Sequence, residues 1–164
     1  MRPAEPVAGA GGLLLLVSLY LPWYGLELPA GTGNLAAPVL AAELAGATAS
    51  GWQAFTVTDI LLALLALPAI AVPIVSLTAR GPAKPIAVEV IASAVGWIAV
   101  VLVAYRLIDP PGPNAFIALR YGAWLALAGA LIAWVGSWLA MSDESTPGAV
   151  APDVPRRPAP PPAA

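Results

Sequence analysis

The chain contains no cysteine and no histidine among its 164 residues. Disulfide bonds, thiol nucleophiles, Ser-His-Asp triads and the usual zinc, haem and iron–sulfur ligand sets are therefore excluded, and no cofactor is expected. Charged residues are scarce as well, at 10% of the chain, and the formal net charge is only −2. So small a charge argues against nucleic acid as a partner.

Hydrophobic residues, by contrast, make up 60% of the chain, and the mean hydropathy is +0.85. Soluble domains carry about 25% charged residues, so this chain lacks the polar side chains that a water-facing surface needs. We therefore expect an integral membrane protein with the lipid bilayer as its surroundings. The abundance of Ala, Gly and Pro is typical of GC-rich bacteria, which favours a multi-pass protein of the bacterial inner membrane.

Four apolar stretches are long enough to cross a bilayer, whose core of about 30 Å requires roughly 20 helical residues. They predict an all-α transmembrane domain over residues 1–141, a four-helix bundle with spans at about 7–24, 60–79, 86–108 and 121–141. The first stretch also resembles a signal peptide, but bulky Leu21-Pro22-Trp23-Tyr24 follows it where a peptidase prefers small residues. We expect a retained helix.

The distribution of basic residues predicts the orientation of these spans. Five lie on one side, Arg2, Arg80, Lys84, Arg156 and Arg157, and two lie on the other, Arg106 and Arg120. Because the more basic flanks stay in the cytoplasm, both termini are expected inside. The long first loop is then outside.

Small residues recur along the fourth span and form a candidate helix-packing stripe of Gly122, Ala126, Gly129, Ala133, Gly136 and Ala140. In lipid, such residues mark the faces on which helices approach each other closely. Packing inside the monomer is the favoured interpretation, and a dimer face is the alternative.

Four charged residues at the outer ends of the spans form a candidate polar cluster: Asp59, Arg106, Asp109 and Arg120. Their common depth permits an ion-pair network at the mouth of the bundle, with Arg106 and Asp109 three residues apart. The favoured interpretation is a solvated set of interface anchors, because exposed ion pairs contribute only about 0–1 kcal/mol.

Glu89 is the one acidic residue inside a predicted span. A charge buried in a membrane marks a functional site by default. Glu89 lies about one turn after Pro85, however, near the inner end of its helix, and a boundary anchor is therefore favoured over a proton relay.

Two segments outside the spans differ from them in residue pattern and composition. In the first loop Leu35, Val39, Leu40 and Leu44 have near-helical spacing, which predicts a short amphipathic helix on the membrane surface. Residues 142–164 are rich in proline and cannot form a core. We expect them to be a disordered cytoplasmic tail.

The chain resembles a family of small, uncharacterised four-helix integral membrane proteins from GC-rich bacteria. The resemblance rests on residues 21–24 (LPWY), 50–55 (SGWQAF), 106–112 (RLIDPPG) and 122–125 (GAWL) through Asp143-Glu144. It implies the topology and no activity. Claudin-type tetraspans are a looser comparison, with four helices, internal termini and tryptophans in a longer first loop, but this chain lacks their paired cysteines and Gly-Leu-Trp motif.

These observations predict a non-enzymatic membrane protein, an interaction or accessory subunit that acts through its helix faces and first outer loop. Its partner would be another membrane protein or a second copy of itself. The alternative is a small transporter or channel subunit with Asp59, Arg106 or Glu89 along its path. An enzyme ranks third. Catalysis would need paired carboxylates, and the outer carboxylates of this chain are scattered over loops.

Overall fold

The computed structural model describes residues 3–27, 47–78, 83–112 and 116–144, without the side chains of 83–84 and 143–144. Most of these residues are helical. The elements are α1 (Ala4–Ser18), β1 (Pro22–Leu26), β2 (Thr48–Ser50), α3 (Gly51–Ala54), α4 (Thr58–Thr78), α5 (Ala83–Ile108), β3 (Ile117–Leu119) and α6 (Tyr121–Glu144).

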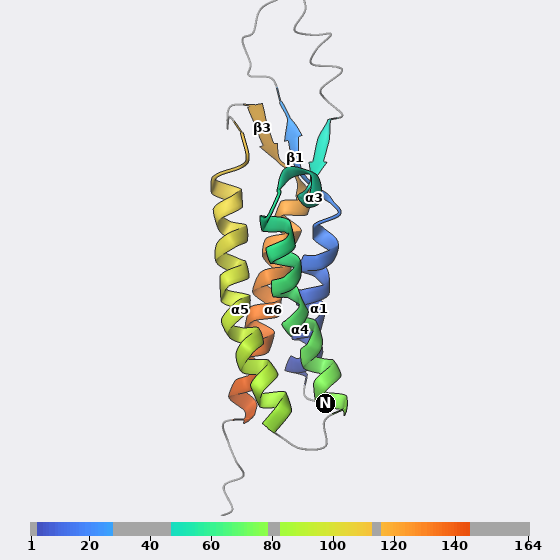
Figure 1. Cartoon of the computed structure of the whole chain (residues 1–164), viewed down its shortest axis with the longest axis vertical. Helices are drawn as coiled ribbons and strands as arrows, with labels where there is room; N and C mark the ends of the chain where they lie inside the picture. Colours follow the sequence, from blue (N-terminus) through green and yellow to red (C-terminus); the bar gives the residue numbers. More distant parts are fainter. Residues whose placement is uncertain (1–2, 28–46, 79–82, 113–115, 145–164) are drawn as a thin grey trace, which may run out of the picture.

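Three of these helices, α4, α5 and α6, are long and apolar enough to cross a membrane. The fourth, α1, has 15 residues and is a shorter apolar helix. The four lie side by side, with α6 and α4 each packed between α1 and α5 (Figure 1). We refer to this assembly of α1, α4, α5 and α6 as the helical body.

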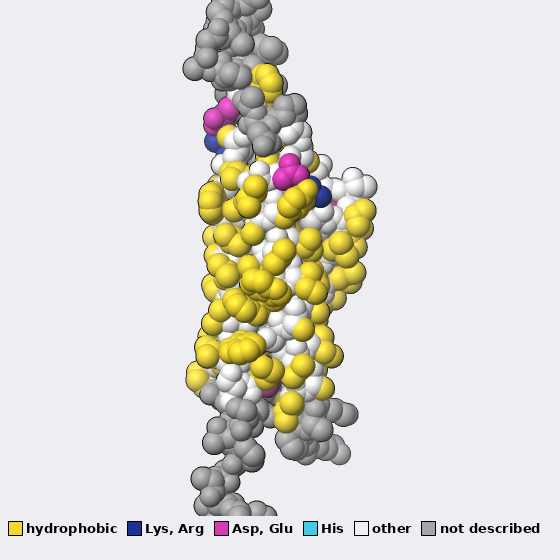
Figure 2. All heavy atoms as spheres, turned by 90° about the vertical axis from the view of Figure 1, so that its left-hand side faces the viewer, with side chains coloured by type: hydrophobic (Ala, Val, Ile, Leu, Met, Phe, Trp, Pro, Cys, Tyr) yellow, Lys and Arg dark blue, Asp and Glu magenta, His cyan; other side chains and the backbone are white. Residues whose placement is uncertain are grey.

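The surface of the helical body is apolar over most of its length (Figure 2). Large hydrophobic side chains that would be buried in a soluble protein are exposed here, for example Leu64 at 56%, Ile91 at 53% and Trp138 at 53%. Acidic and basic side chains on the face drawn in Figure 2 lie mainly toward its upper end. An apolar belt of this kind suits a hydrocarbon environment, because it leaves few polar groups without water.

A small antiparallel sheet covers the upper end of the helical body in Figure 1, with the strand order β2-β1-β3. The central strand β1 pairs through Tyr24 with Ala49 of β2 on one side and with Leu119 of β3 on the other. The sheet thus joins the segment after α1 to both of the other segments at this end. Together with α3 it forms what we call the sheet cap.

The sheet cap corrects the all-α prediction and the predicted first span of residues 7–24. The helix ends at Ser18, and the chain becomes extended at Pro22. Pro22 has no backbone N–H for a helical hydrogen bond and disfavours helical geometry at Leu21, while Trp23 and Tyr24 suit a strand. Hydropathy alone does not distinguish these apolar strand residues from the end of a membrane helix.

The other three predicted spans coincide with α4, α5 and α6 to within a few residues. Residues 142–144, predicted as the start of the tail, belong to α6 instead, since no proline interrupts the helix there. The rest of the predicted tail, 145–164, lies outside the described residues. So does the amphipathic helix predicted around Leu35–Leu44.

Helices α1 and α6 pack through a line of small residues that we call the glycine seam: Ala8 and Gly11 of α1, and Gly129, Ala133 and Gly136 of α6. A Cβ atom at Gly129 would lie 2.6 Å from the Leu15 backbone nitrogen, and one at Gly136 would lie 2.6 Å from the Ala8 nitrogen. These neighbours are backbone atoms, which cannot rotate away. The two backbones are therefore in direct contact, as small residues allow in membrane helices.

Candidate functional site

The sheet cap has an aromatic core between the sheet and the helix ends. Trp23 is fully buried, and its indole Nε1 donates a hydrogen bond to the Ser18 carbonyl oxygen at 2.8 Å. The Phe55 ring meets those of Trp23 and Tyr24 edge-on, with centroid separations of 5.3 and 5.8 Å. Edge-to-face pairs stabilise beyond their buried area, so this trio fixes β1 against the start of α4.

Arg106, in the last turn of α5, joins this core to α4 and β1. Its Nη2 donates to the Thr58 hydroxyl oxygen at 2.8 Å, and its guanidinium carbon lies 4.9 Å from the centre of the Phe55 ring. Its backbone carbonyl accepts a hydrogen bond from the Tyr24 hydroxyl at 2.8 Å. One arginine thus connects three elements, and its charge lies over an aromatic face that can stabilise it.

Tyr24 is 4% exposed, and burial raises the pKa of its phenol to about 12. The positive charge of Arg106 opposes this rise, whereas the negative charge of Asp109 adds to it. The phenol is therefore neutral at physiological pH and acts as a hydrogen-bond donor. A neutral, bonded tyrosine in this position contributes to structure rather than to acid–base chemistry.

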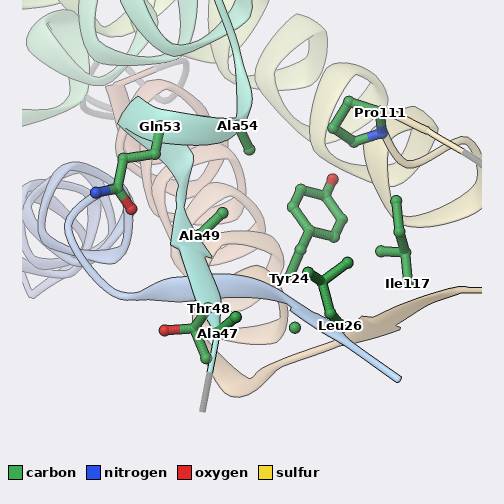
Figure 3. Close-up of a pocket in the computed structure, with 10 residues that line it drawn as sticks. Tyr24, Leu26, Ala47, Thr48, Ala49, Gln53, Ala54, Pro111 and Ile117 are labelled. Atoms are coloured by element: carbon green, nitrogen blue, oxygen red, sulfur yellow. The ribbon is translucent and has the colours of Figure 1, made fainter. Parts of the chain in front are cut away.

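Beside Tyr24 the sheet cap contains an open pocket of about 360 Å³, which we call the cap pocket. In Figure 3 Ala49 and Ala54 lie on one side of it and Pro111 and Ile117 on the other, with the Tyr24 ring between them. The Gln53 side chain points away from the ring, and its Oε1 accepts the Ser50 N–H at 3.0 Å. The walls are consequently small and apolar.

The four residues of the predicted polar cluster do not form one network in the described residues. Arg106 bonds to Thr58, whereas the Asp109 carboxylate accepts a hydrogen bond from the Tyr105 hydroxyl at 2.6 Å. Asp59 is 5% exposed at the start of α4, where its Oδ1 accepts the Ile60 N–H at 2.8 Å.

Arg120 lies apart from the other three, on the sheet. Its Nη2 is 3.6 Å from the Glu27 Oε1, and its side chain lies over Gly25 so closely that a Cβ there would clash with it. A Cβ at position 25 would therefore displace the flexible guanidinium of Arg120. Glu27, rather than a member of the predicted cluster, is its acidic neighbour.

The predicted packing stripe of α6 lies in the interior of the helical body. Gly129, Ala133 and Gly136 face α1 in the glycine seam, and Gly122 lies against the Pro22 backbone. Ala126 and Ala140 are fully buried. In this arrangement the stripe is covered by the chain's own α1 and β1, not open to a second copy.

Sequence reasoning missed three buried residues with polar groups, Tyr24, Thr58 and Glu5. Tyr24 was predicted at the end of the first span and Thr58 in the first outer loop, and the strand that positions Tyr24 was not predicted. Glu5 precedes the first predicted span, although it is only 5% exposed. Its place three residues before Ala8, on the face that carries the small residues of α1, was the available signal.

Comparison with known proteins finds no match: no family model, no curated protein and no solved structure matches this chain. The described residues also contain no group of three or more Asp and Glu side chains that could hold a metal ion. What the sheet cap offers chemically is an apolar pocket with the Tyr24 ring and the Thr48 hydroxyl at its edge.

Proposed function

We propose that this chain is a four-span membrane protein of the bacterial inner membrane, with both termini inside and the sheet cap outside. Support for α1 as a span comes from its outward side chains Val7, Leu13 and Val17, which are apolar and about half exposed. At about 1.5 Å per residue α1 is about 22 Å long, so the bilayer would thin slightly around it. The basic residues Arg2, Arg80 and Lys84, which adjoin the opposite helix ends in the sequence, support the orientation.

We further propose that the protein is a non-enzymatic interaction subunit whose sheet cap binds another membrane protein. The cap pocket is the observation that carries this proposal. A pocket with small apolar walls and few polar groups suits a hydrophobic side chain of a partner, since it provides buried area without unpaired charge.

The glycine seam bears on how such a partner would bind. Because α1 and β1 cover the packing stripe of α6, the binding surface that we propose is the sheet cap rather than the predicted helix face. The exposed apolar faces of α4, α5 and α6 are left to lipid.

A photo-crosslinking residue in place of Ala49 tests the proposal, with the same residue in place of Val57 as its control. Val57 lies in the same region, is 60% exposed and does not line the pocket. We expect a single crosslinked membrane protein from position 49, identified by mass spectrometry, that disappears when Ala54→Trp fills the pocket. Equal crosslinking from both positions, or a product that persists in Ala54→Trp, would contradict a role for the pocket.

One observation favours the second candidate function, a small transporter or channel subunit. Glu89 is fully buried within the helical body, in the first two turns of α5. A carboxylate inside a membrane bundle is costly and usually has a role in ion or proton binding.

A further inference from the structure

The end of α5 nearest the sheet cap carries a cation and an anion that do not pair with each other. Arg106 and Asp109 are three residues apart, a spacing at which opposite charges on a helix can meet. Within the part of the chain that the structure describes, however, no ion pair involves either residue. Arg106 donates to the neutral Thr58 hydroxyl, and Asp109 accepts from the neutral Tyr105 hydroxyl. Both charges therefore remain available to a charged ligand.

Tyr105 lies between the two charges and holds them on one surface. The Arg106 guanidinium carbon is 5.5 Å from the centre of the Tyr105 ring, and the Tyr105 hydroxyl oxygen is 2.6 Å from the Asp109 Oδ2. A guanidinium has five N–H donors, and Thr58 receives one of them. The exposed Asp109 has its second carboxylate oxygen left over. We call Tyr105, Arg106 and Asp109 the charged end of α5.

An apolar surface leads along α5 to this charged end. Four side chains at intervals of three or four residues share one helix face, and each is about half exposed or more: Ile98, Val101, Tyr105 and Ile108. Figure 2 looks onto the side of the helical body that carries α5 and shows charged side chains above the apolar belt. The segment long and apolar enough to span a membrane ends at Ile108, so Arg106 lies at the level of the lipid headgroups in the membrane that we propose. A surface of this kind suits an amphiphile better than a soluble ion.

We propose that the charged end of α5 binds the headgroup of an ethanolamine phospholipid in the leaflet on the sheet-cap side. The Arg106 guanidinium holds the phosphate through charge-assisted hydrogen bonds, and the Asp109 carboxylate accepts N–H bonds from the ammonium group. The acyl chains follow the apolar surface of α5.

The order of the charges supports this choice of lipid. In the headgroup the phosphate lies nearer the acyl chains and the ammonium lies further out. Arg106 likewise precedes Asp109 along a helix that leads out of the bilayer. A choline headgroup has no N–H to donate to Asp109, and a glycerol headgroup has no positive charge. Asp59, next to Thr58 at this end, adds a second negative charge and disfavours an anionic lipid.

Native mass spectrometry of the full-length protein from nanodiscs tests the proposal, which rests on the proposed membrane location. The nanodiscs contain equal amounts of phosphatidylcholine, phosphatidylethanolamine and phosphatidylglycerol, and the lipids that stay bound to the protein are counted. We expect phosphatidylethanolamine to be retained several-fold more often than either of the others. Soluble phosphoethanolamine, added at the same concentration as the lipid, should not displace it, because it lacks acyl chains. Displacement would overturn the assignment to a lipid.

Two exposed carboxylates at the same end provide a matched pair of variants. Asp109→Asn keeps an oxygen for the Tyr105 hydroxyl but loses the charge, and should abolish the preference for phosphatidylethanolamine over phosphatidylcholine. Glu27→Gln, whose carboxylate faces Arg120 instead, should leave the preference unchanged. Arg106→Met, measured on its folded fraction, should retain less of every phospholipid because it lacks the phosphate ligand.

Three results would overturn the proposal: equal retention of the three lipids, a preference that persists in Asp109→Asn, or stronger retention of phosphatidylglycerol. The last would indicate that the guanidinium alone attracts anions. Each of these results leaves a protein that enters the nanodisc, so the proposed membrane location would stand. A chain that does not enter nanodiscs would contradict the membrane location itself.

Discussion

The glycine seam and the sheet cap both hold α1 in place, but they use opposite kinds of side chain. In the seam, Gly129 and Gly136 let the backbones of α6 and α1 touch. In the cap, Trp23, Phe55 and Arg106 fill the space between elements with large rings and hydrogen bonds.

The contrast follows from the surroundings that we propose for each region. In lipid, burial of apolar area contributes little free energy to helix association, so close backbone packing must supply it. At the water-facing end, burial of aromatic area stabilises directly. The seam should therefore tolerate no added volume, whereas the cap should tolerate no lost volume.

The largest expected effect comes from added volume in the seam. Gly129→Leu places atoms where the Leu15 backbone lies, and we expect α1 to separate from α6 and the folded protein to be lost. Ala128→Leu adds nearly the same volume at a half-buried neighbouring position and should leave the protein folded. Thermal unfolding followed by circular dichroism at several protein concentrations measures both. A Gly129→Leu protein that unfolds normally but loses a dimer would favour the alternative dimer face instead.

Lost volume in the cap should have the next largest effect. Trp23→Ala removes a fully buried ring and the bond to the Ser18 carbonyl, and should cost about 3–5 kcal/mol of unfolding free energy. Denaturant titration in detergent gives this value. Trp23→Phe, which retains a ring against Phe55, should cost less than half as much; equal costs for the two variants would show that the ring packing is unimportant.

The hydrogen bond between Arg106 and Thr58 tests how much polar contacts add to the stability at the sheet-cap end. We expect Arg106→Met to cost about 2 kcal/mol, because it removes a charged donor while keeping the aliphatic stem. A double-mutant cycle with Thr58→Val should give a coupling of about 1 kcal/mol. Additive effects of the two substitutions would contradict a direct bond.

Tyr24 should contribute about 1 kcal/mol through its hydrogen bond to the Arg106 carbonyl. Because the folded protein raises the pKa of this phenol from 10 to about 12, it holds the proton more tightly than the unfolded chain. The contribution should thus be complete below pH 10 and disappear as the pH rises toward 12. The stability difference from Tyr24→Phe, measured across this range, checks the direction; a difference that grows with pH would be inconsistent with the buried donor.

The smallest effect is expected for the ion pair of Glu27 with Arg120. Glu27 is 64% exposed, so Glu27→Gln should change the stability by less than about 1 kcal/mol. Any difference should vanish in high salt. Gly25→Ala should have a similarly small effect in the same thermal assay, because the flexible Arg120 guanidinium can move away from the added methyl group.

The parts of this molecule that could be predicted from the sequence are those formed by long segments of similar composition. Helices α4, α5 and α6 follow from uninterrupted apolar runs, and the small residues of α6 mark its packing face. The sheet cap could not be predicted in this way. Strands β2 and β3 have three residues each and are joined to β1 only in three dimensions.

The same limit applies to the polar residues. A common depth was predicted for Asp59, Arg106, Asp109 and Arg120, but their partners were not, because Tyr24, Thr58 and Glu27 lie on other elements. Register between helices, rather than composition, decides these sites.

The most direct test of the account is which side of the membrane each end of the helical body faces. The natural chain has no cysteine, so single substitutions report one position at a time. Thr56→Cys marks the sheet cap and Thr78→Cys marks the opposite end of α4; both positions are exposed. We predict that a membrane-impermeant maleimide labels position 56 in intact spheroplasts and position 78 only after the membrane is opened. Labelling of both positions from outside, or recovery of the folded protein without lipid or detergent, would contradict the account.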